Sequence, residues 1–254
     1  MAMIENGRRW AQRQGKPLSL GIVVGLIVTS LVTFFVPSVY RALYFNAGDM
    51  GERPWSFLTY PLAYTGVGGP FTILFFIFLL FWVLFAGGFL EKDAGIGKAA
   101  AFWVVMTVLP AIVMGIGGRL LGTGVPLAGP YLPVAAVTVY WGIRNKEFPI
   151  LLWGILPLKG LYIAILDVVG TFFMFGAGGG AAPILGLLAC IHLGIAWLLA
   201  ERAMIRIPDV PKKTKAQLER EEKFEDEVLR RKKERDEVER LRRLLEGPTG
   251  GEDR

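Results

Sequence analysis

The sequence AAPILGLLACIHLGIAWLLA, residues 181–200, carries no formal charge. An α-helix of this length rises about 30 Å, which is enough to cross the hydrocarbon core of a bilayer. His192, the only histidine of the chain, stands near its middle. A polar, titratable ring at that depth is costly unless it faces other protein groups. We therefore predict a membrane-spanning helix that lies inside a bundle and turns His192 toward its neighbours.

The composition also indicates a membrane protein. Of the 254 residues 53% are hydrophobic, and the mean hydropathy is +0.47, which is too apolar for a soluble domain of this size. Residues 201–254 hold 16 basic and 15 acidic side chains, against 12 and 7 in residues 1–200. Because acids match the bases of this tail, we expect no nucleic-acid partner. We expect no metal and no other cofactor, since the lone Cys190 has no partner for a metal site and is read as a small core residue.

Five further apolar runs precede residues 181–200. The chain is therefore predicted to be an all-α polytopic membrane protein, a bundle of six transmembrane helices with a charged helical tail. The spans are expected at Leu18–Val36, Pro70–Leu90, Lys98–Ile116, Pro126–Ile143, Phe148–Phe173 and residues 182–200. The first run is too long for a typical signal peptide and has no clear cleavage site after it, so we interpret it as an uncleaved helix.

An even number of spans places both termini on one side of the membrane. That side carries four basic residues in the amino-terminal segment and, in the turns after spans two and four, Lys92, Lys98, Arg144 and Lys146. The opposite side has only Arg41, Arg53 and Arg119. The positive-inside tendency puts both termini in the cytoplasm, and we expect the inner membrane of a bacterium. The predicted domains are a cytoplasmic segment 1–17, a membrane domain 18–202 and a cytoplasmic tail 203–254.

The tail between Lys212 and Glu246 is rich in Glu, Lys and Arg and has no Pro or Gly, so it is predicted to be helical. Nothing apolar lies between Leu229 and Val238, which interrupts any long heptad seam. Two interpretations remain open. The tail is either a solvated charged helix or makes a short coiled-coil contact through Val238–Leu245.

Four stretches follow one another in an order that is similar to a known family. They are RPWSFLTYPLAY (53–64), GFLEKDAG (88–95), ILPLKGLYIAIL (155–166) and CIHLGIAW (190–197). Together with the helix count they resemble the rhomboid family of six-helix intramembrane serine proteases, over residues 18–202. The resemblance implies a rhomboid-like fold, with His192 on the last helix at the position of the family's catalytic base.

The same resemblance implies that the catalytic apparatus is missing. The family's Gly-x-Ser-Gly turn corresponds to Leu127–Pro133, and if Gly129 matches its first glycine, Tyr131 takes the nucleophile's place. No serine follows Ser56, and the family's His-x-x-x-Asn pair of the second span has no counterpart near Ile73. A protease of this type needs an attacking hydroxyl beside the histidine and donors for the oxyanion. The resemblance therefore points to a pseudoprotease, in which His192 is vestigial.

Other single residues carry two interpretations each. His192 either contacts Tyr131, by a hydrogen bond or through the rings, or is a satisfied core histidine. Asp167 is either a functional intramembrane carboxylate or an ordinary hydrated carboxylate near the outer membrane interface. Glu91 is expected to be a helix-end or loop-anchoring carboxylate. Trp55 and Tyr60 either dip into the outer leaflet in a membrane-embedded loop or anchor the interface. Gly194 is expected at a close helix contact, together with Gly186.

Three functions follow from these patterns. The first is a non-catalytic protein that lies in the lipid bilayer and binds transmembrane helices of client proteins. Its tail would then offer a coiled-coil contact to a cytosolic partner. The second is an active serine/threonine-type rhomboid protease with a displaced nucleophile at Thr123 or Thr138. The third is a small transporter that would depend on His192 and Asp167, which ranks low because transport usually needs more polar groups at mid-membrane depth.

Overall fold

The computed structural model describes residues 16–64, 70–152, 156–205 and 230. The chain divides into two compact units, Met1–Arg206 and Ile207–Arg254, and the fold below is that of the first. The predicted tail helix Lys212–Glu246 and the coiled-coil contact at Val238–Leu245 lie outside the described residues, apart from Arg230. Of the predicted amino-terminal segment only residues 16 and 17 are described.

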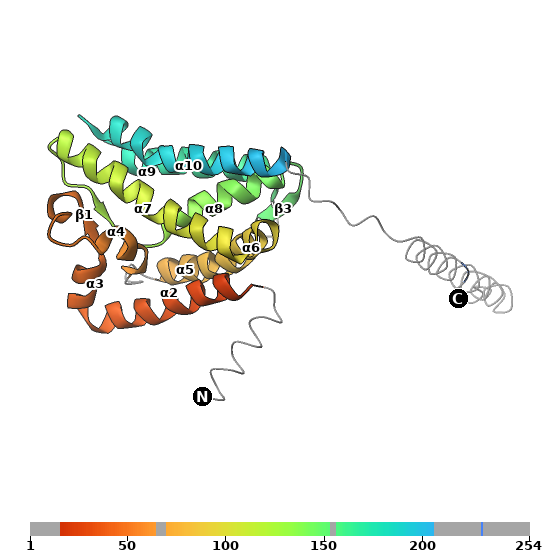
Figure 1. The fold of residues 1–254 in the computed structure, drawn as a ribbon, viewed down its shortest axis with the longest axis horizontal. Helices are drawn as coiled ribbons and strands as arrows, with labels where there is room; N and C mark the ends of the chain where they lie inside the picture. Colours follow the sequence, from red (N-terminus) through yellow and green to blue (C-terminus); the bar gives the residue numbers. More distant parts are fainter. Residues whose placement is uncertain (1–15, 65–69, 153–155, 206–229, 231–254) are drawn as a thin grey trace, which may run out of the picture. The chain divides into compact units, whose positions relative to one another are not determined.

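The described chain is mostly helical (Figure 1). The longer helices are α2 (Pro17–Phe35), α5 (Pro70–Trp82), α6 (Gly88–Ala94), α7 (Ile96–Leu120), α8 (Tyr131–Arg144), α9 (Gly160–Gly176) and α10 (Ala182–Ile205). A π-helical turn, Val83–Gly87, joins α5 to α6. The connection from α2 to α5 contains α3 (Pro37–Leu43), α4 (Ser56–Thr59) and two 3-10 turns, Ala47–Asp49 and Tyr60–Leu62.

Four helices are long and apolar enough to cross a membrane. They are Pro17–Phe35, Phe71–Ala94, Ile96–Leu120 and Ala182–Arg202. The structure therefore agrees with the expected helical membrane protein. Six spans stay a prediction, because α9 has 17 residues and α8 only 14, fewer than the about 20 that a straight span needs.

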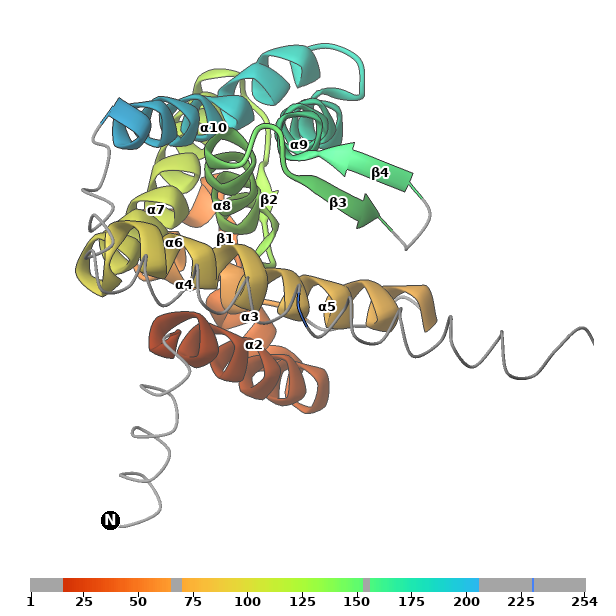
Figure 2. The same cartoon turned by 90° about the vertical axis from the view of Figure 1, so that its right-hand side faces the viewer.

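Helix α8 is the centre of the bundle. All twelve residues from Leu132 to Ile143 are buried, and Figure 2 shows α7, α9, α10 and the α5–α6 helix around it. Small side chains let the neighbours approach closely: a Cβ on Gly142 would lie 2.4 Å from the carbonyl oxygen of Gly160. Such a helix is apolar all round, as expected for a buried one. The core of the protein is therefore built on the helix that the sequence places fourth.

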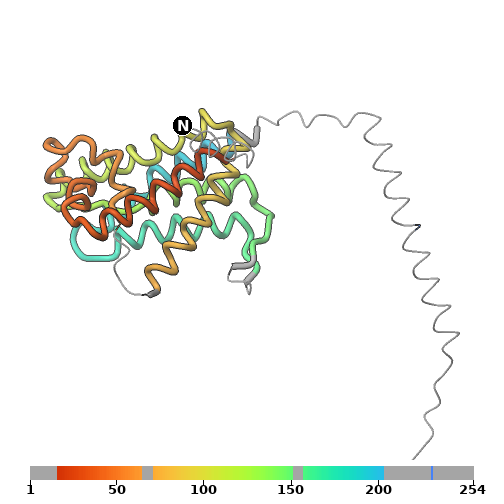
Figure 3. Tube along the Cα trace, turned by 90° about the horizontal axis from the view of Figure 1, so that it is seen from below, coloured from red at the N-terminus to blue at the C-terminus, as the bar shows by residue number. Residues whose placement is uncertain are grey.

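Helix α5 has a different position. It carries Phe71, Phe75 and Phe81, which are 82%, 62% and 68% exposed, and Figure 3 shows it tilted relative to α2. The carboxyl end of the same helix, through the π-helical turn, packs against α2 and α8. The amino-terminal half of α5 thus presents an apolar surface to its surroundings.

Two pairs of short strands depart from the all-α prediction. Strand β1 (Phe45–Asn46) pairs antiparallel with β2 (Pro126–Leu127), and β3 (Pro149–Leu152) pairs antiparallel with β4 (Leu156–Lys159). The predicted fourth and fifth spans therefore begin too early. Helix α8 begins at Tyr131 instead of Pro126, since Pro126–Leu127 form β2. Helix α9 begins at Gly160 instead of Phe148, since Pro149–Leu152 and Leu156–Lys159 form β3 and β4.

Candidate functional site

His192 is buried on α10, with 1% of its surface exposed. Its Nε2 lies 3.0 Å from the backbone carbonyl oxygen of Leu132 on α8. Among the described residues no donor is hydrogen-bonded to Nδ1. The predicted hydrogen bond between His192 and Tyr131 is wrong, because the imidazole bonds to the backbone of the next residue. These contacts are those of a core histidine that holds α10 against α8.

This arrangement determines which ring nitrogen can act as a base. A neutral imidazole that bonds a carbonyl through Nε2 must carry its proton on that nitrogen. Nε2 then has no lone pair with which to remove a proton from an attacking hydroxyl. The protease reaction needs such a hydroxyl within about 3 Å of the base, and no described serine, threonine or tyrosine hydroxyl bonds the His192 ring.

Tyr131 is the first residue of α8 and turns toward α9. Its hydroxyl is 3.3 Å from Oγ1 of Thr171, and Gly170 leaves room for it, since a Cβ there would lie 3.4 Å from the phenol oxygen. The side chain of Tyr131 thus lies against α9, whereas the backbone carbonyl of Leu132 faces His192 on α10. Tyr131 and His192, the two residues predicted to meet, are therefore not in contact through a hydrogen bond.

The two threonines of the protease alternative do not meet His192 either. Thr138 Oγ1 donates to the carbonyl oxygen of Val134 at 2.9 Å and accepts from Nε1 of Trp82 at 2.8 Å. Thr123 has a buried hydroxyl without a partner among the described residues. Neither hydroxyl is hydrogen-bonded to the His192 ring, which a displaced nucleophile of the rhomboid type would require.

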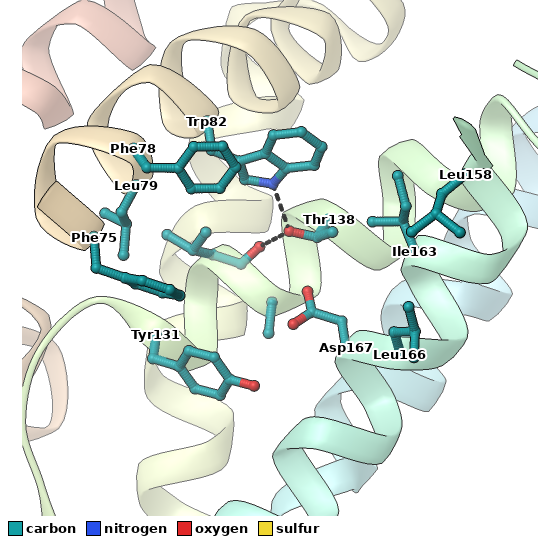
Figure 4. Close-up of a pocket in the computed structure, with 12 residues that line it drawn as sticks. Phe75, Phe78, Leu79, Trp82, Tyr131, Thr138, Leu158, Ile163, Leu166 and Asp167 are labelled. Atoms are coloured by element: carbon teal, nitrogen blue, oxygen red, sulfur yellow. Dashed lines mark hydrogen bonds between the residues drawn. The ribbon is translucent and has the colours of Figure 1, made fainter. Parts of the chain in front are cut away.

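A pocket of about 390 Å³ lies beside α8, between α5 and α9 (Figure 4). Its volume is in the range of ligand pockets, about 300–1,000 Å³. Most of its lining is apolar or aromatic. The residues that matter below are Phe75, Phe78 and Trp82 of α5, Tyr131 and Thr138 of α8, and Leu166 and Asp167 of α9.

Among the described residues that line this pocket, Asp167 is the only charged one. Figure 4 shows its carboxylate turned toward Thr138, with the hydroxyl of Tyr131 directed into the same space. No ion pair joins Asp167 to a cation among the described residues. The carboxylate of Asp167 thus stands in a largely apolar pocket that is lined by three helices and by Leu158 of β4.

Lys159 is held in an ion pair outside α9. It ends β4, directly before α9, and its Nζ is 2.5 Å from Oε2 of Glu147. This hydrogen bond raises the pKa of Lys159. Lys159 is the basic residue nearest to Asp167 in the sequence, and it is already paired with Glu147 at the end of the β3–β4 hairpin.

Glu91 anchors a helix end, as predicted. Its two carboxylate oxygens accept hydrogen bonds from the backbone amides of Leu18 at 3.0 Å and Ser19 at 2.5 Å. These are among the first amides of α2, which have no partner within the helix. Glu91 of α6 therefore caps the amino terminus of α2, a role that a residue next to the helix in sequence usually has.

The remaining predicted residues have mixed outcomes. Trp55 is 52% exposed and donates from Nε1 to the carbonyl oxygen of Ala42 at 2.9 Å, whereas Tyr60 is buried within the protein. Gly186 is in close contact, since a Cβ would lie 2.7 Å from the carbonyl oxygen of Phe172. Gly194 has nothing within 4 Å of that position, so its predicted helix contact is wrong within the described chain.

One polar contact was missed by the sequence reasoning. Asp93 of α6 binds Arg144 of α8 and also accepts from the hydroxyl of Tyr140. The sequence offered one indication of this contact, because Asp93 and Arg144 lie in turns that are expected on the same side of the membrane. No group of three His, Cys, Asp or Glu residues suited to a metal occurs within the described ranges.

The chain matches no protein-family model, and no curated protein gives a significant match to it.

Proposed function

We propose that this protein is a rhomboid-like pseudoprotease that binds transmembrane segments of other membrane proteins without cleaving them. The observation that carries the proposal is the pocket between α5 and α9. It is largely apolar, and it adjoins the exposed phenylalanines at the start of α5. An apolar helix entering from the bilayer would find both a surface and a cavity there.

The contacts of His192 support the loss of hydrolysis. Its Nε2 bonds a backbone carbonyl, and no described hydroxyl stands beside the ring. An active serine/threonine protease is the alternative. It would require Thr138 to leave Trp82 and Val134, or Thr123 to move to His192, before either could be activated.

We further propose that both termini face the cytoplasm of a bacterial cell, and that the tail offers a contact for a cytoplasmic partner. The support is the distribution of basic residues: Arg144 and Lys146 follow α8, and Lys92 and Lys98 flank the turn between α6 and α7. Such residues favour the cytoplasmic side of a membrane.

Site-specific photo-crosslinking tests the binding function. The full chain is placed in lipid nanodiscs with single-span peptides, and a photoreactive amino acid replaces Leu166 at the pocket. The matched control replaces Leu31 on α2, because both leucines are 56% exposed. We expect peptide adducts from position 166 well above those from position 31. Equal adduct yields at the two positions would contradict the proposal.

The same samples test the loss of hydrolysis. We expect intact peptides on mass spectrometry and no labelling of the protein by a fluorophosphonate. Cleaved peptide, together with labelling that disappears in Thr138→Ala or Thr123→Ala, would establish the protease alternative instead.

A further inference from the structure

We infer that the pocket between α5 and α9 selects transmembrane helices that carry one basic side chain near the middle of their span, and that this side chain pairs with Asp167. The inference rests on the proposed binding function and names the class of helix that the pocket takes.

No cation is paired with the Asp167 carboxylate inside the described part of the protein, and its polar neighbours are the hydroxyls of Thr138 and Tyr131. No other charged residue lines the pocket, and Lys159 is bonded to Glu147. Eight residues separate Lys159 from Asp167, about 12 Å along a helix, so the lysine does not reach the carboxylate. A charge within a membrane is costly unless it is paired. An incoming cation would supply the missing partner.

The aromatic and apolar residues of the lining also suit a basic side chain. Trp82, Phe75 and Phe78 contribute aromatic rings on the α5 side of the pocket, opposite Asp167 on α9 (Figure 4). Aromatic faces attract Lys and Arg, and the aliphatic stem of either residue packs well on an apolar wall. The pocket thus combines a carboxylate at one side with rings at the other.

The depth of Asp167 favours a helix side chain over a lipid headgroup. Asp167 is seven residues beyond Gly160, the first residue of α9, which corresponds to about 10 Å along the helix axis. The ammonium group of a lipid stays at the interface, whereas a residue at the centre of a spanning helix lies at mid-membrane depth. The geometry therefore points to the central part of another protein's span.

The experiment compares three peptides in nanodiscs of phosphatidylcholine. Each is a Leu/Ala helix of about 20 residues, long enough to span the bilayer, with Arg, Leu or Glu at its centre. Adducts are measured from the photoreactive group at position 166. We expect the Arg peptide to exceed the Leu peptide by about tenfold, the equivalent of about 1.4 kcal/mol, and the Glu peptide to give the lowest yield.

Matched variants assign this preference to Asp167. Asp167→Asn should remove the preference for Arg, while Asp167→Glu, which keeps the charge, should retain it. Glu147→Gln removes the same charge outside the pocket and should leave the preference intact. Size-exclusion and thermal-unfolding profiles establish that each variant is folded.

The outcomes separate this inference from the proposed function. Equal yields for the three peptides, all above the control at position 31, would overturn the basic-residue selectivity and leave client binding in place. Yields no higher than the control for every peptide would overturn both. Loss of the preference in Glu147→Gln as well as Asp167→Asn would show general electrostatics and contradict a role for the pocket. Adducts to lipid alone, in discs enriched in phosphatidylethanolamine, would identify a headgroup site instead.

Discussion

Asp93 and Arg144 form a two-point ion pair between α6 and α8. Nε of Arg144 lies 2.9 Å from Oδ2 of Asp93, and Nη2 lies 2.8 Å from Oδ1. The two side chains are only 12–13% exposed, and Tyr140 donates a further hydrogen bond to the same carboxylate at 2.7 Å. The paired geometry and the partial burial make this contact stronger than an ordinary surface ion pair.

A double-mutant cycle with Asp93→Asn and Arg144→Gln should therefore give a coupling energy of about 1–3 kcal/mol. The free energy of unfolding of the full chain is measured in detergent micelles by titration with a denaturing detergent. The exposed pair Lys159–Glu147 provides the control and should show a much smaller coupling. Additive effects of the two substitutions would mean that the ion pair does not stabilise the bundle.

The contact of Glu91 with α2 predicts a loss of stability on substitution. Glu91→Ala removes the acceptor of two backbone amides and should lower the free energy of unfolding by about 0.5–2 kcal/mol, as the loss of a helix cap does. Glu91→Gln keeps one acceptor oxygen and should cost less. Hydrogen exchange at Leu18 and Ser19 reports on the same contact, and unchanged exchange in Glu91→Ala would contradict it.

Two glycines of α10 provide a matched comparison. In Gly186→Ala the new methyl group would meet the carbonyl oxygen of Phe172 at 2.7 Å, and such overpacking should destabilise the protein by about 1–3 kcal/mol. Gly194→Ala meets nothing within 4 Å and should be neutral or stabilise the helix by up to about 1 kcal/mol. Thermal unfolding in detergent measures both, and the reverse order would disprove the packing described for α10.

His192 should behave as a structural residue. His192→Ala removes the hydrogen bond to Leu132 and leaves a cavity beside α8, so we expect a loss of about 1–3 kcal/mol in the free energy of unfolding. Ile191→Ala, at a neighbouring position that is 43% exposed, should cost less. A His192→Ala protein as stable as the unsubstituted chain would mean that the imidazole is not needed for packing.

The sequence predicted the helices well where length and apolarity decide. The first predicted span, Leu18–Val36, differs from α2 by one residue at each end, and the role of Glu91 at a helix end was predicted and confirmed. The hairpin of β3 and β4 was not predicted. Its residues continue the apolar run that leads into α9, and an unbroken apolar run gives no periodicity that separates strand from buried helix.

The position of side chains around each helix was harder to predict. Helix α10 is apolar on nearly all sides, so its sequence does not tell which face meets α8. Counting residues put Tyr131 opposite His192, but the imidazole bonds the backbone carbonyl of Leu132, a contact that no pattern of side chains encodes. The pocket around Asp167 is lined by α5, α8, α9 and Leu158 of β4, and only the packed structure brings α5 to the others.

The contact between Glu91 and the start of α2 also bears on biosynthesis. The amides of Leu18 and Ser19 leave the ribosome more than seventy residues before the carboxylate that binds them. Until that carboxylate has been synthesised, the two amides lack the hydrogen bonds that they have in the folded protein. The beginning of α2 therefore reaches its final bonding only after α6 has been made.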